Sequence, residues 1–494
     1  MRFRSLSRGR FNKGTQGQVF GGIRKNYKGT GLEKVQARKR KYNLIMAFLI
    51  VLLETLAVSF VWVVYYNTEL PKAYYFWGHV FISVVYMCVL LFASSMYGGL
   101  KIGSYRMLEL FFSQIIATFF TNVLFYAMVC MLAYHFPTPL PLIAAMVIQC
   151  FLTGAWIFLA TTFYRGLFPP LDVLLIYDGV HKDLFVEKVR TRRHQFEIRE
   201  TIKVSDDLEY MYSRIDGHEA VMLWDINTDL RNRLHKYCYE KSKETYVMPK
   251  IMDIVLRGAT TLHFFDSPLM LTKSSPIEYE QALVKRAFDV IFSLILIIVL
   301  SPFMLITALC IKLYDRGPVL YKQVRVTGGD REFEIIKFRS MIVDAEKDGV
   351  ARLARKHDDR ITPVGRVIRK IRFDEFPQLF NVLKGDMSFV GPRPERPAII
   401  EQYTKAMPEF KYRTKVKAGI TGYAQVYGKY NTLPYDKLKL DLFYIENFSV
   451  WLDLRLIILT VKTIFTLEST EGISEGSLNA LPPAEGPEKG DNNG

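Results

Sequence analysis

Long apolar runs dominate the first third of the chain. Four of them are long enough to span a bilayer, which takes about twenty residues. They occupy residues 43–66, 74–96, 110–134 and 140–163. The N-terminal arm and loop 97–109 carry Lys and Arg, whereas loop 135–139 carries neither. By the positive-inside rule, this pattern predicts four transmembrane helices, with the N-terminus and everything after residue 165 in the cytoplasm.

Glu54 lies in the middle of the first apolar run. A charge at that depth is costly. We therefore expect this carboxyl group to be protonated or paired inside the helix bundle, and a functional role is the alternative.

A fifth apolar run, residues 290–311, differs from the others because Ser301-Pro302 lies near its middle and basic residues flank both ends. Proline removes a backbone donor and clashes with the carbonyl four residues earlier, which kinks or breaks a helix. A straight span would carry the basic part that follows across the membrane. The pattern thus favours a re-entrant helix that bends at Ser301-Pro302 and returns to the same face. The freed backbone carbonyl needs a partner at membrane depth, and Ser301 could supply one.

Short apolar runs alternate with amphipathic stretches between residues 172 and 265. Their order predicts a β-α-β-α-β-α-β module, a small parallel sheet with crossover helices. Its first strand-to-helix turn reads "DGVHKD" and contains no GxGxxG, so the dinucleotide fingerprint is absent. We interpret the module as Rossmann-like, with a regulatory or oligomerisation role, and we expect the protein to form a homo-oligomer, a dimer.

Residues 312–466 begin with two predicted strands, "PVLYKQVRV" and "EFEIIKF", joined by a Gly-Gly turn. A polar helix is predicted at 344–359. The segment "PVGRVIRKIRF" predicts an amphipathic basic helix suited to an anionic lipid surface. Residues 469–494 contain almost no large apolar groups and are predicted to be disordered.

Charge narrows the choice of partners. The chain carries a net charge of +16. Residues 1–43 contribute +12 and residues 312–466 contribute +10, and the remaining residues together carry a net negative charge. A basic domain suits phosphates and lipid headgroups. We do not expect nucleic acid, because the basic residues adjoin membrane segments. The five cysteines form no CxxC or Cys/His cluster, which argues against a zinc site or a disulfide framework.

An acidic pair ends the basic run in "RVIRKIRFDEFPQLF", residues 366–380. The apolar stripe that follows predicts a helix with Pro377 in its first turn, Asp374 near the N-cap and Glu375 near the first helical position. Asp374 can be read as a simple cap. A helix N-terminus also lowers the pKa of a carboxylate and attracts phosphate. A carboxylate in that place can attack phosphorus and form an acyl phosphate.

Several long motifs carry a family resemblance. The segments are "KRAFDVIFSLILIIVLSPF", "KFRSM", "DDRITPVGRVIRKIRFDEFPQLFNVLKGDMSFVGPRPERP" and "KAGITGYAQVYG". Over residues 285–466 the chain resembles the bacterial polyprenyl-phosphate sugar-phosphate transferases. These are the monotopic phosphoglycosyl transferases that begin exopolysaccharide, capsule or O-antigen synthesis. The four spans and the Rossmann-like module ahead of that domain resemble the large members of this family.

The resemblance implies transfer of a sugar-1-phosphate from a UDP-sugar to undecaprenyl phosphate, with release of UMP and a need for Mg²⁺. It assigns the nucleophile to Asp374, and an assisting and Mg²⁺-holding role to Glu375. The family's phosphate-contacting residues match Lys337, Arg339, Arg369 and Arg393, and its membrane-helix break matches Ser301-Pro302.

The chain departs from the family pattern at two places. Ile371-Arg372-Phe373 stand where Thr-Ser-Leu is common, and Pro363 stands where a basic residue is common. These departures bear on fine tuning, including the choice of sugar. Lys429 matches a family basic position or serves the surface, and Asp441 is equally well read as functional or structural.

The predicted protein is a multi-pass protein of the bacterial inner membrane, with its catalytic domain on the cytoplasmic face and in contact with membrane lipid. It combines a four-helix transmembrane bundle, a Rossmann-like α/β module and an α/β catalytic domain with a re-entrant membrane helix. The predicted boundaries are 1–42 for a basic arm, 43–164 for the four helices, 165–276 for the Rossmann-like module, 277–311 for the re-entrant helix, 312–466 for the catalytic domain and 467–494 for a disordered tail.

Two alternatives remain at this point. The first is a non-catalytic membrane scaffold or regulator, whose basic domain binds anionic lipid. The second is a glycosyltransferase that moves the sugar alone and releases UDP. Such an enzyme normally presents a DxD motif, and none lies near the acidic pair.

Overall fold

The computed structural model describes residues 31–179, 182–264, 266–273, 276–343, 360–428 and 432–465. The predicted polar helix at 344–359, Lys429, the predicted disordered tail and residues 1–30 of the basic arm lie outside the described residues. The chain divides into two compact units, which are described separately below. The first contains the N-terminal helices and the second contains everything from residue 221 onward.

The four N-terminal apolar runs are helices, as the hydrophobic pattern predicted. They are α2 (Gly31–Val64), α3 (Phe76–Tyr97), α4 (Met107–Ala133) and α5 (Leu140–Leu167), with a short 3-10 turn, η1 (Tyr66–Glu69), after the first. Side chains from all four helices form one apolar core that includes Trp62, Leu90, Leu110 and Trp156. These helices, together with the later helix α10, are long and apolar enough to cross a membrane.

Glu54 is fully buried and hydrogen-bonded inside this set of helices, which confirms the expectation of pairing within the bundle. The Thr118 hydroxyl donates to Oε2 at 2.7 Å and the Thr153 hydroxyl donates to Oε1 at 2.8 Å. The Gln114 amide donates to both oxygens at 3.2 Å. These donors are neutral and come from α4 and α5, so the carboxyl group links three helices.

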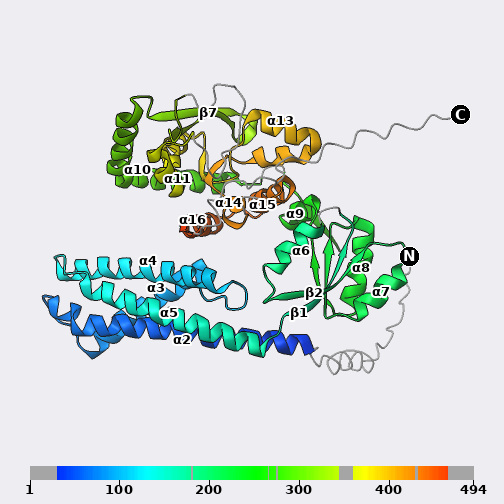
Figure 1. Ribbon diagram of the computed structural model, residues 1–494, viewed down its shortest axis with the longest axis horizontal. Coiled ribbons are helices and arrows are strands. Elements are labelled where there is room, and N and C mark those ends of the chain that lie inside the picture. Colours follow the sequence, from blue (N-terminus) through cyan, green and yellow to red (C-terminus); the bar gives the residue numbers. More distant parts are fainter. Residues whose placement is uncertain are drawn as a thin grey trace, which may run out of the picture. The chain divides into compact units, whose positions relative to one another are not determined.

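The α/β module follows the predicted order of strands and helices. Its elements are β1 (Leu171–Tyr177), α6 (Lys182–Arg190), β2 (Phe196–Lys203), α7 (Leu208–Asp216), β3 (Ala220–Trp224), α8 (Thr228–Glu240), β4 (Glu244–Val247) and α9 (Ile251–Arg257). The four strands form one sheet in the order β2-β1-β3-β4 (Figure 1). β1 and β3 are almost wholly buried, in keeping with their continuous apolar sequences. A separate antiparallel hairpin follows, β5 (Thr260–Phe264) and β6 (Ser267–Leu271).

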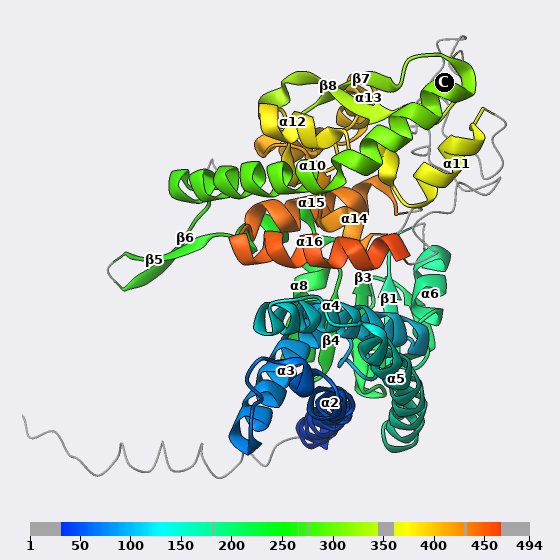
Figure 2. The same cartoon turned by 90° about the vertical axis from the view of Figure 1, so that its left-hand side faces the viewer.

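The fifth apolar run is a single helix, α10 (Tyr279–Asp315), with Pro302 inside it. The backbone stays helical across Pro302, so the predicted break is instead a bend within one helix, which Figure 2 shows. Pro302 cannot donate to the carbonyl of Ile298, and the Ser301 hydroxyl donates to that oxygen at 2.9 Å. This is the partner that the sequence suggested for the freed carbonyl.

Both ends of α10 pack on the same domain. Near the N-terminal end, the Lys285 Nζ lies 2.5 Å from the Asp453 Oδ2, and the Asp289 Oδ1 accepts from the Phe389 N–H at 2.8 Å. At the C-terminal end, Ile311 packs in a cluster with residues of the domain that follows. Only 6% of the most apolar stretch of α10 is buried, against 28% to 33% in the four N-terminal helices.

The domain after α10 begins with the predicted strand pair, β7 (Leu320–Val326) and β8 (Glu332–Phe338), which is antiparallel. The turn between them, η2 (Gly328–Asp330), places Gly329 at φ 71°, a left-handed conformation that suits glycine. The predicted basic helix is α11 (Pro363–Lys370), capped by the Thr362 hydroxyl, which accepts from the Gly365 N–H at 2.9 Å.

The rest of this domain is built from short elements. They are η3 (Phe373–Glu375), α12 (Gln378–Lys384), β9 (Ser388–Val390), α13 (Pro397–Ala406), η4 (Pro408–Lys415), β10 (Gly419–Thr421), α14 (Tyr423–Tyr427), α15 (Pro434–Glu446) and α16 (Val450–Phe465). β9 and β10 pair in parallel, with Gly419 opposite Ser388. One apolar core, which includes Val390, Phe410, Leu442 and Leu456, joins β9, η4, α15 and α16.

Candidate active site

The acidic pair lies in the 3-10 turn η3, between α11 and α12. Arg372 adopts a left-handed conformation with φ 57° and separates the turn from α11. The α-helix begins only at Gln378, after Pro377, so the prediction that Asp374 is its N-cap is wrong. Aromatic packing fixes the turn instead: the ring of Phe373 is stacked on that of Phe338 in β8, with centroids 6.3 Å apart.

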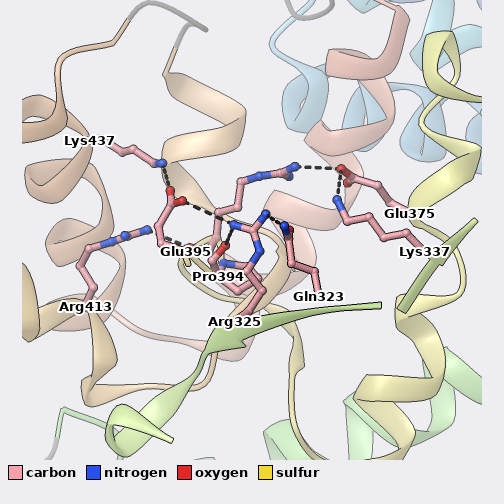
Figure 3. A network of polar contacts seen from close by, with 9 residues as sticks. Gln323, Arg325, Lys337, Glu375, Pro394, Glu395, Arg413 and Lys437 are labelled. Carbon is pink, nitrogen blue, oxygen red and sulfur yellow. Dashed lines mark hydrogen bonds and ion pairs between the residues drawn. The ribbon is translucent and has the colours of Figure 1, made fainter. Parts of the chain in front are cut away.

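Glu375 is surrounded by cations. Its Oε1 lies 2.8 Å from the Arg393 Nη2, 3.2 Å from the Lys337 Nζ and 3.6 Å from the Arg372 Nη1. The Glu375 side chain is 12% exposed, and those of Lys337 and Arg393 are 20% and 34% exposed. Lys337 comes from β8 and meets Glu375 in Figure 3. Arg393 comes from the loop after β9 and Arg372 directly precedes the turn, so three separate segments converge on one carboxylate.

The two carboxyl groups of the turn have opposite electrostatic environments. Burial would raise the pKa of Glu375, but Arg393, Lys337 and Arg372 outweigh burial and hold this pKa well below its usual value. Burial and the charge of Glu375 raise the pKa of Asp374, while Lys337 and Arg369 oppose that rise. The expectation that the surroundings lower the pKa of Asp374 is therefore wrong, and Glu375 is the acid that is held ionised.

The predicted phosphate-contacting residues do not all gather at one point. The structure brings Lys337 and Arg393 onto Glu375, and Arg369 is close enough for its charge to affect the pKa of Asp374. It places Arg339 elsewhere, in an ion pair with Asp315 at the end of α10, where the Arg339 side chain is 7% exposed. The role of Arg339 toward phosphate stays a prediction.

Sequence reasoning missed two contacts. Arg372 was counted only as a departure from the family pattern, although its spacing of three residues from Glu375 was a signal. The second is the ion pair of Arg413 with Asp441, an acid whose role the sequence does not decide. No sequence pattern joins these two residues, because they meet only through the packing of η4 on α15.

The donor set at the turn suits Mg²⁺ only in part. Mg²⁺ usually binds one or two carboxylates and takes its remaining ligands from water and substrate phosphates. Asp374 and Glu375 provide two adjacent carboxylates, and the described residues hold no group of three or more His, Cys, Asp or Glu side chains that could enclose a metal. A metal at Glu375 would share that carboxylate with Lys337 and Arg393. The residues therefore fit an ion whose shell is completed by a phosphate ligand.

Comparison with known proteins covers this part of the chain. Residues 280–467 match the family described as "Bacterial sugar transferase". The exopolysaccharide production protein PSS of Rhizobium leguminosarum bv. phaseoli is 41% identical over 193 residues, which cover 37% of this chain and 95% of that protein. The chain belongs to the bacterial sugar transferase family. The motifs that carried the resemblance thus identified the family correctly.

Two longer proteins are also similar to part of this chain. A UDP-N-acetylgalactosamine-undecaprenyl-phosphate N-acetylgalactosaminephosphotransferase of Aeromonas hydrophila is 45% identical over 207 residues, 41% of this chain and 48% of that protein. An undecaprenyl-phosphate glucose phosphotransferase of Komagataeibacter xylinus is 40% identical over 227 residues, 44% of this chain and 43% of that protein. The chain therefore spans about half the length of these relatives.

Proposed function

We propose that this protein transfers a sugar-1-phosphate from a UDP-sugar to undecaprenyl phosphate and releases UMP, as the first membrane step of a surface polysaccharide. The observation that carries the proposal is the acidic turn itself. It holds Glu375 within a shell of Lys337, Arg393 and Arg372, with Asp374 directly beside it, on a domain anchored to an exposed apolar helix. The names of its family relatives, which act on undecaprenyl phosphate, support the same reaction class.

The cationic shell suits a reaction at phosphorus. Phosphoryl transfer depends mainly on positioning and on stabilising the charge of the phosphoryl oxygens. Glu375 keeps Lys337 and Arg393 in place while no phosphate is present, and both side chains remain partly exposed to an incoming ligand. Burial lowers the pKa of Lys337 and the charge of Glu375 opposes that effect, so Glu375 helps to keep the ammonium group charged.

Asp374 is the proposed nucleophile. Its carboxylate oxygen attacks the phosphorus that bears the sugar, a new O–P bond forms, and the bond from that phosphorus to the bridging oxygen breaks as UMP leaves. An oxygen of undecaprenyl phosphate then attacks the same phosphorus and releases the Asp374 carboxylate. The raised pKa of Asp374 makes its carboxylate more basic, which favours attack once the group is ionised.

Mg²⁺ is part of the proposal. Asp374 and Glu375 would hold it together with substrate phosphate oxygens, and when bound it would neutralise charge on those oxygens. This chain's own residues orient the phosphate: Lys337 and Arg393 approach Glu375 from one side of the turn, and Arg369 contributes positive charge near Asp374.

The membrane arrangement follows from α10. Both ends of this helix pack on one domain, while its middle exposes Leu294, Ile298, Phe303 and Ile306. Those side chains require an apolar environment. A bent helix that enters and leaves on one face satisfies both conditions, so we propose that α10 is re-entrant and that the acidic turn lies at the cytoplasmic headgroup plane.

Product analysis tests the reaction. The full chain in lipid nanodiscs is given Mg²⁺ and a panel of UDP-sugars that includes UDP-glucose and UDP-N-acetylgalactosamine. It should release UMP over many turnovers only when undecaprenyl phosphate is added, and without the lipid UMP release should stop after the first half-reaction. Asp374→Asn should lower this rate at least about a thousandfold, because it removes the nucleophile. Release of UDP would indicate a glycosyltransferase, and near-normal turnover by Asp374→Asn would exclude this residue as the nucleophile.

Labelling tests the path of α10. In a cysteine-free background, single cysteines are placed at Tyr279 and Tyr314, two exposed positions at the two ends of α10. Both should react with an impermeant maleimide from the cytoplasmic side of inverted vesicles. Reaction of the two positions from opposite sides would show a full span and contradict the re-entrant arrangement.

A further inference from the structure

A buried ion pair contacts the backbone of Arg393. The Arg413 Nε donates to the Asp441 Oδ2 at 2.7 Å, and these side chains are 5% and 1% exposed. The same guanidinium donates from Nη2 to the backbone carbonyl of Arg393 at 3.0 Å. One arginine thus connects a buried carboxylate of α15 to the residue whose side chain reaches Glu375.

The loop that carries Arg393 is held at every residue. The Gly391 N–H donates to the Thr421 carbonyl at 2.8 Å, and the Pro392 carbonyl accepts from the Gly419 N–H at 2.9 Å. The Pro394 carbonyl accepts from the Arg325 Nη1 at 3.2 Å, and the Glu395 Oε1 lies 2.5 Å from the Lys437 Nζ (Figure 3).

Arg413 contributes the contact at Arg393 itself. The other contacts hold the loop on both sides of that residue, and Arg413 holds the carbonyl of Arg393 between them. Its guanidinium also lies over the ring of Phe410, with the Cζ atom 4.8 Å from the ring centroid.

Stability alone does not account for this pair. The free energy needed to remove two charges from water is about as large as the free energy gained from their attraction. Replacing a buried ion pair by apolar residues is therefore often neutral or stabilising. Arginine differs from lysine in that its planar fork can bind a carboxylate through one N–H and a carbonyl through another. Asp441 fixes the orientation of the fork, and the fork fixes the Arg393 carbonyl.

We propose that Arg413, oriented by Asp441, is a positioning residue that sets the place from which the Arg393 guanidinium meets Glu375 and the substrate phosphate. The substrate part of this inference rests on the proposed function. The side-chain hydrogen bonds of Arg413 are with Asp441 and the Arg393 backbone rather than with the acidic turn, so it acts through Arg393.

A double-mutant cycle separates positioning from general stability. Arg413→Lys keeps the buried charge beside Asp441 but loses the fork that reaches the Arg393 carbonyl. It should lower kcat for UMP release roughly ten- to hundredfold, the usual cost of losing a group that orients a functional side chain. In an Arg393→Ala background the same change should cost less than about twofold, because the residue it positions is already gone. Equal losses in the two backgrounds would overturn the proposal.

Arg231→Lys is the matched control. Arg231 forms an ion pair with Asp253, with atoms 2.5 Å apart and the Arg231 side chain 10% exposed, in the α/β module. Asp253 is 38% exposed, so this variant should reproduce the general effect of an Arg-to-Lys change at a buried arginine that pairs with an aspartate, while leaving kcat within about twofold of wild type. If Arg413→Lys fails to fold, Asp441→Asn serves the same cycle, since it keeps the shape of the acid and weakens its hold on Arg413.

Hydrogen exchange gives a readout that needs no turnover. Backbone amides in residues 391–396 should exchange faster in Arg413→Lys than in wild type or Arg231→Lys. Unchanged exchange there would overturn the proposal. If wild type releases no UMP, the proposed function fails while the exchange comparison still decides whether Arg413 fixes the loop.

Discussion

Two carboxylates with little solvent exposure, in different regions of this chain, are stabilised in opposite ways. Glu54, in the N-terminal helices, accepts hydrogen bonds from the amide of Gln114 and from the hydroxyls of Thr118 and Thr153. These are neutral donors from neighbouring helices. They satisfy the carboxyl group without adding positive charge to the surroundings.

Glu375, in the domain after α10, is held by Lys337, Arg393 and Arg372. Three cations around one ionised carboxylate leave an excess of positive charge, which an anionic ligand can use. The comparison teaches that burial of an acid does not by itself indicate function. The charge of its partners separates an acid that joins helices from an acid that organises a phosphate site.

Among the charges of Glu375, Arg372 and Glu54, removal of the Glu375 charge should have the largest effect. Glu375→Gln leaves Lys337 and Arg393 without their counter-ion, and we expect UMP release to fall by roughly a hundredfold, because the cations lose their fixed positions. The charge of Glu375 raises the pKa of Asp374, so this pKa should fall in the variant. The acid limb of the residual pH–rate profile should therefore move to lower pH.

Steady-state kinetics between pH 5 and 9 would check this prediction. Asp386→Asn offers a control, because Asp386 is a buried acid whose ion pairs are with Arg331 and Lys384 and not with the acidic turn. An unchanged acid limb in Glu375→Gln would show that the two carboxyl groups of the turn are not electrostatically linked.

Removing the charge of Arg372 should have an intermediate effect. Arg372 lowers the pKa of both Glu375 and Asp374, so Arg372→Gln should raise the pKa of Asp374. The acid limb should move to higher pH by less than about one unit, because Arg372 is partly exposed and its nearest Glu375 contact is 3.6 Å. Arg366→Gln, at an exposed position of α11, is the control for net charge. A shift toward lower pH would contradict the placement of Arg372.

Removing the charge of Glu54 should have the smallest effect on activity. Glu54→Gln replaces one acceptor oxygen by an NH2 group. This donor would then face the donors of Gln114, Thr118 or Thr153, which should lower the free energy of unfolding by about 1–3 kcal/mol. Turnover per folded molecule should stay within about twofold of wild type, because the hydrogen bonds of Glu54 are made within the N-terminal helices.

Thermal unfolding in detergent, paired with UMP release, would measure both quantities for Glu54→Gln. Thr121→Val is the control, since the Thr121 hydroxyl bonds the Ala117 carbonyl of its own helix. A loss of turnover as large as that of Glu375→Gln would remove the distinction between the two carboxylates.

Local sequence signals anticipated much of the fold. The apolar runs predicted the helices, and the Gly-Gly turn predicted the β7–β8 pair. The position of Pro302 predicted a carbonyl without its helical donor, and Ser301 donates to that carbonyl of Ile298. Each of these features depends on residues within a few positions of one another, or on a single hydrophobic period.

The site was harder to predict because it depends on distant contacts. Pro377 and the apolar stripe suggested a helix starting at Asp374, but stacking of Phe373 on Phe338 favours a 3-10 turn there. The pKa of Asp374 depends on burial and on Glu375 rather than on a helix terminus. Asp441 in α15, Arg413 in η4 and Arg393 in the loop after β9 are linked through contacts that span up to 48 positions of sequence. No periodicity in the sequence encodes this link.

The covalent step at Asp374 is the central claim, and mass spectrometry of the protein tests it most directly. The purified full chain is incubated with Mg²⁺ and a UDP-sugar, without undecaprenyl phosphate, then quenched and digested. The account predicts a peptide that carries a sugar-phosphate adduct on Asp374, which disappears when the lipid acceptor is added and does not form in Asp374→Asn. An adduct on a different residue, or transfer that proceeds in Asp374→Asn, would contradict it.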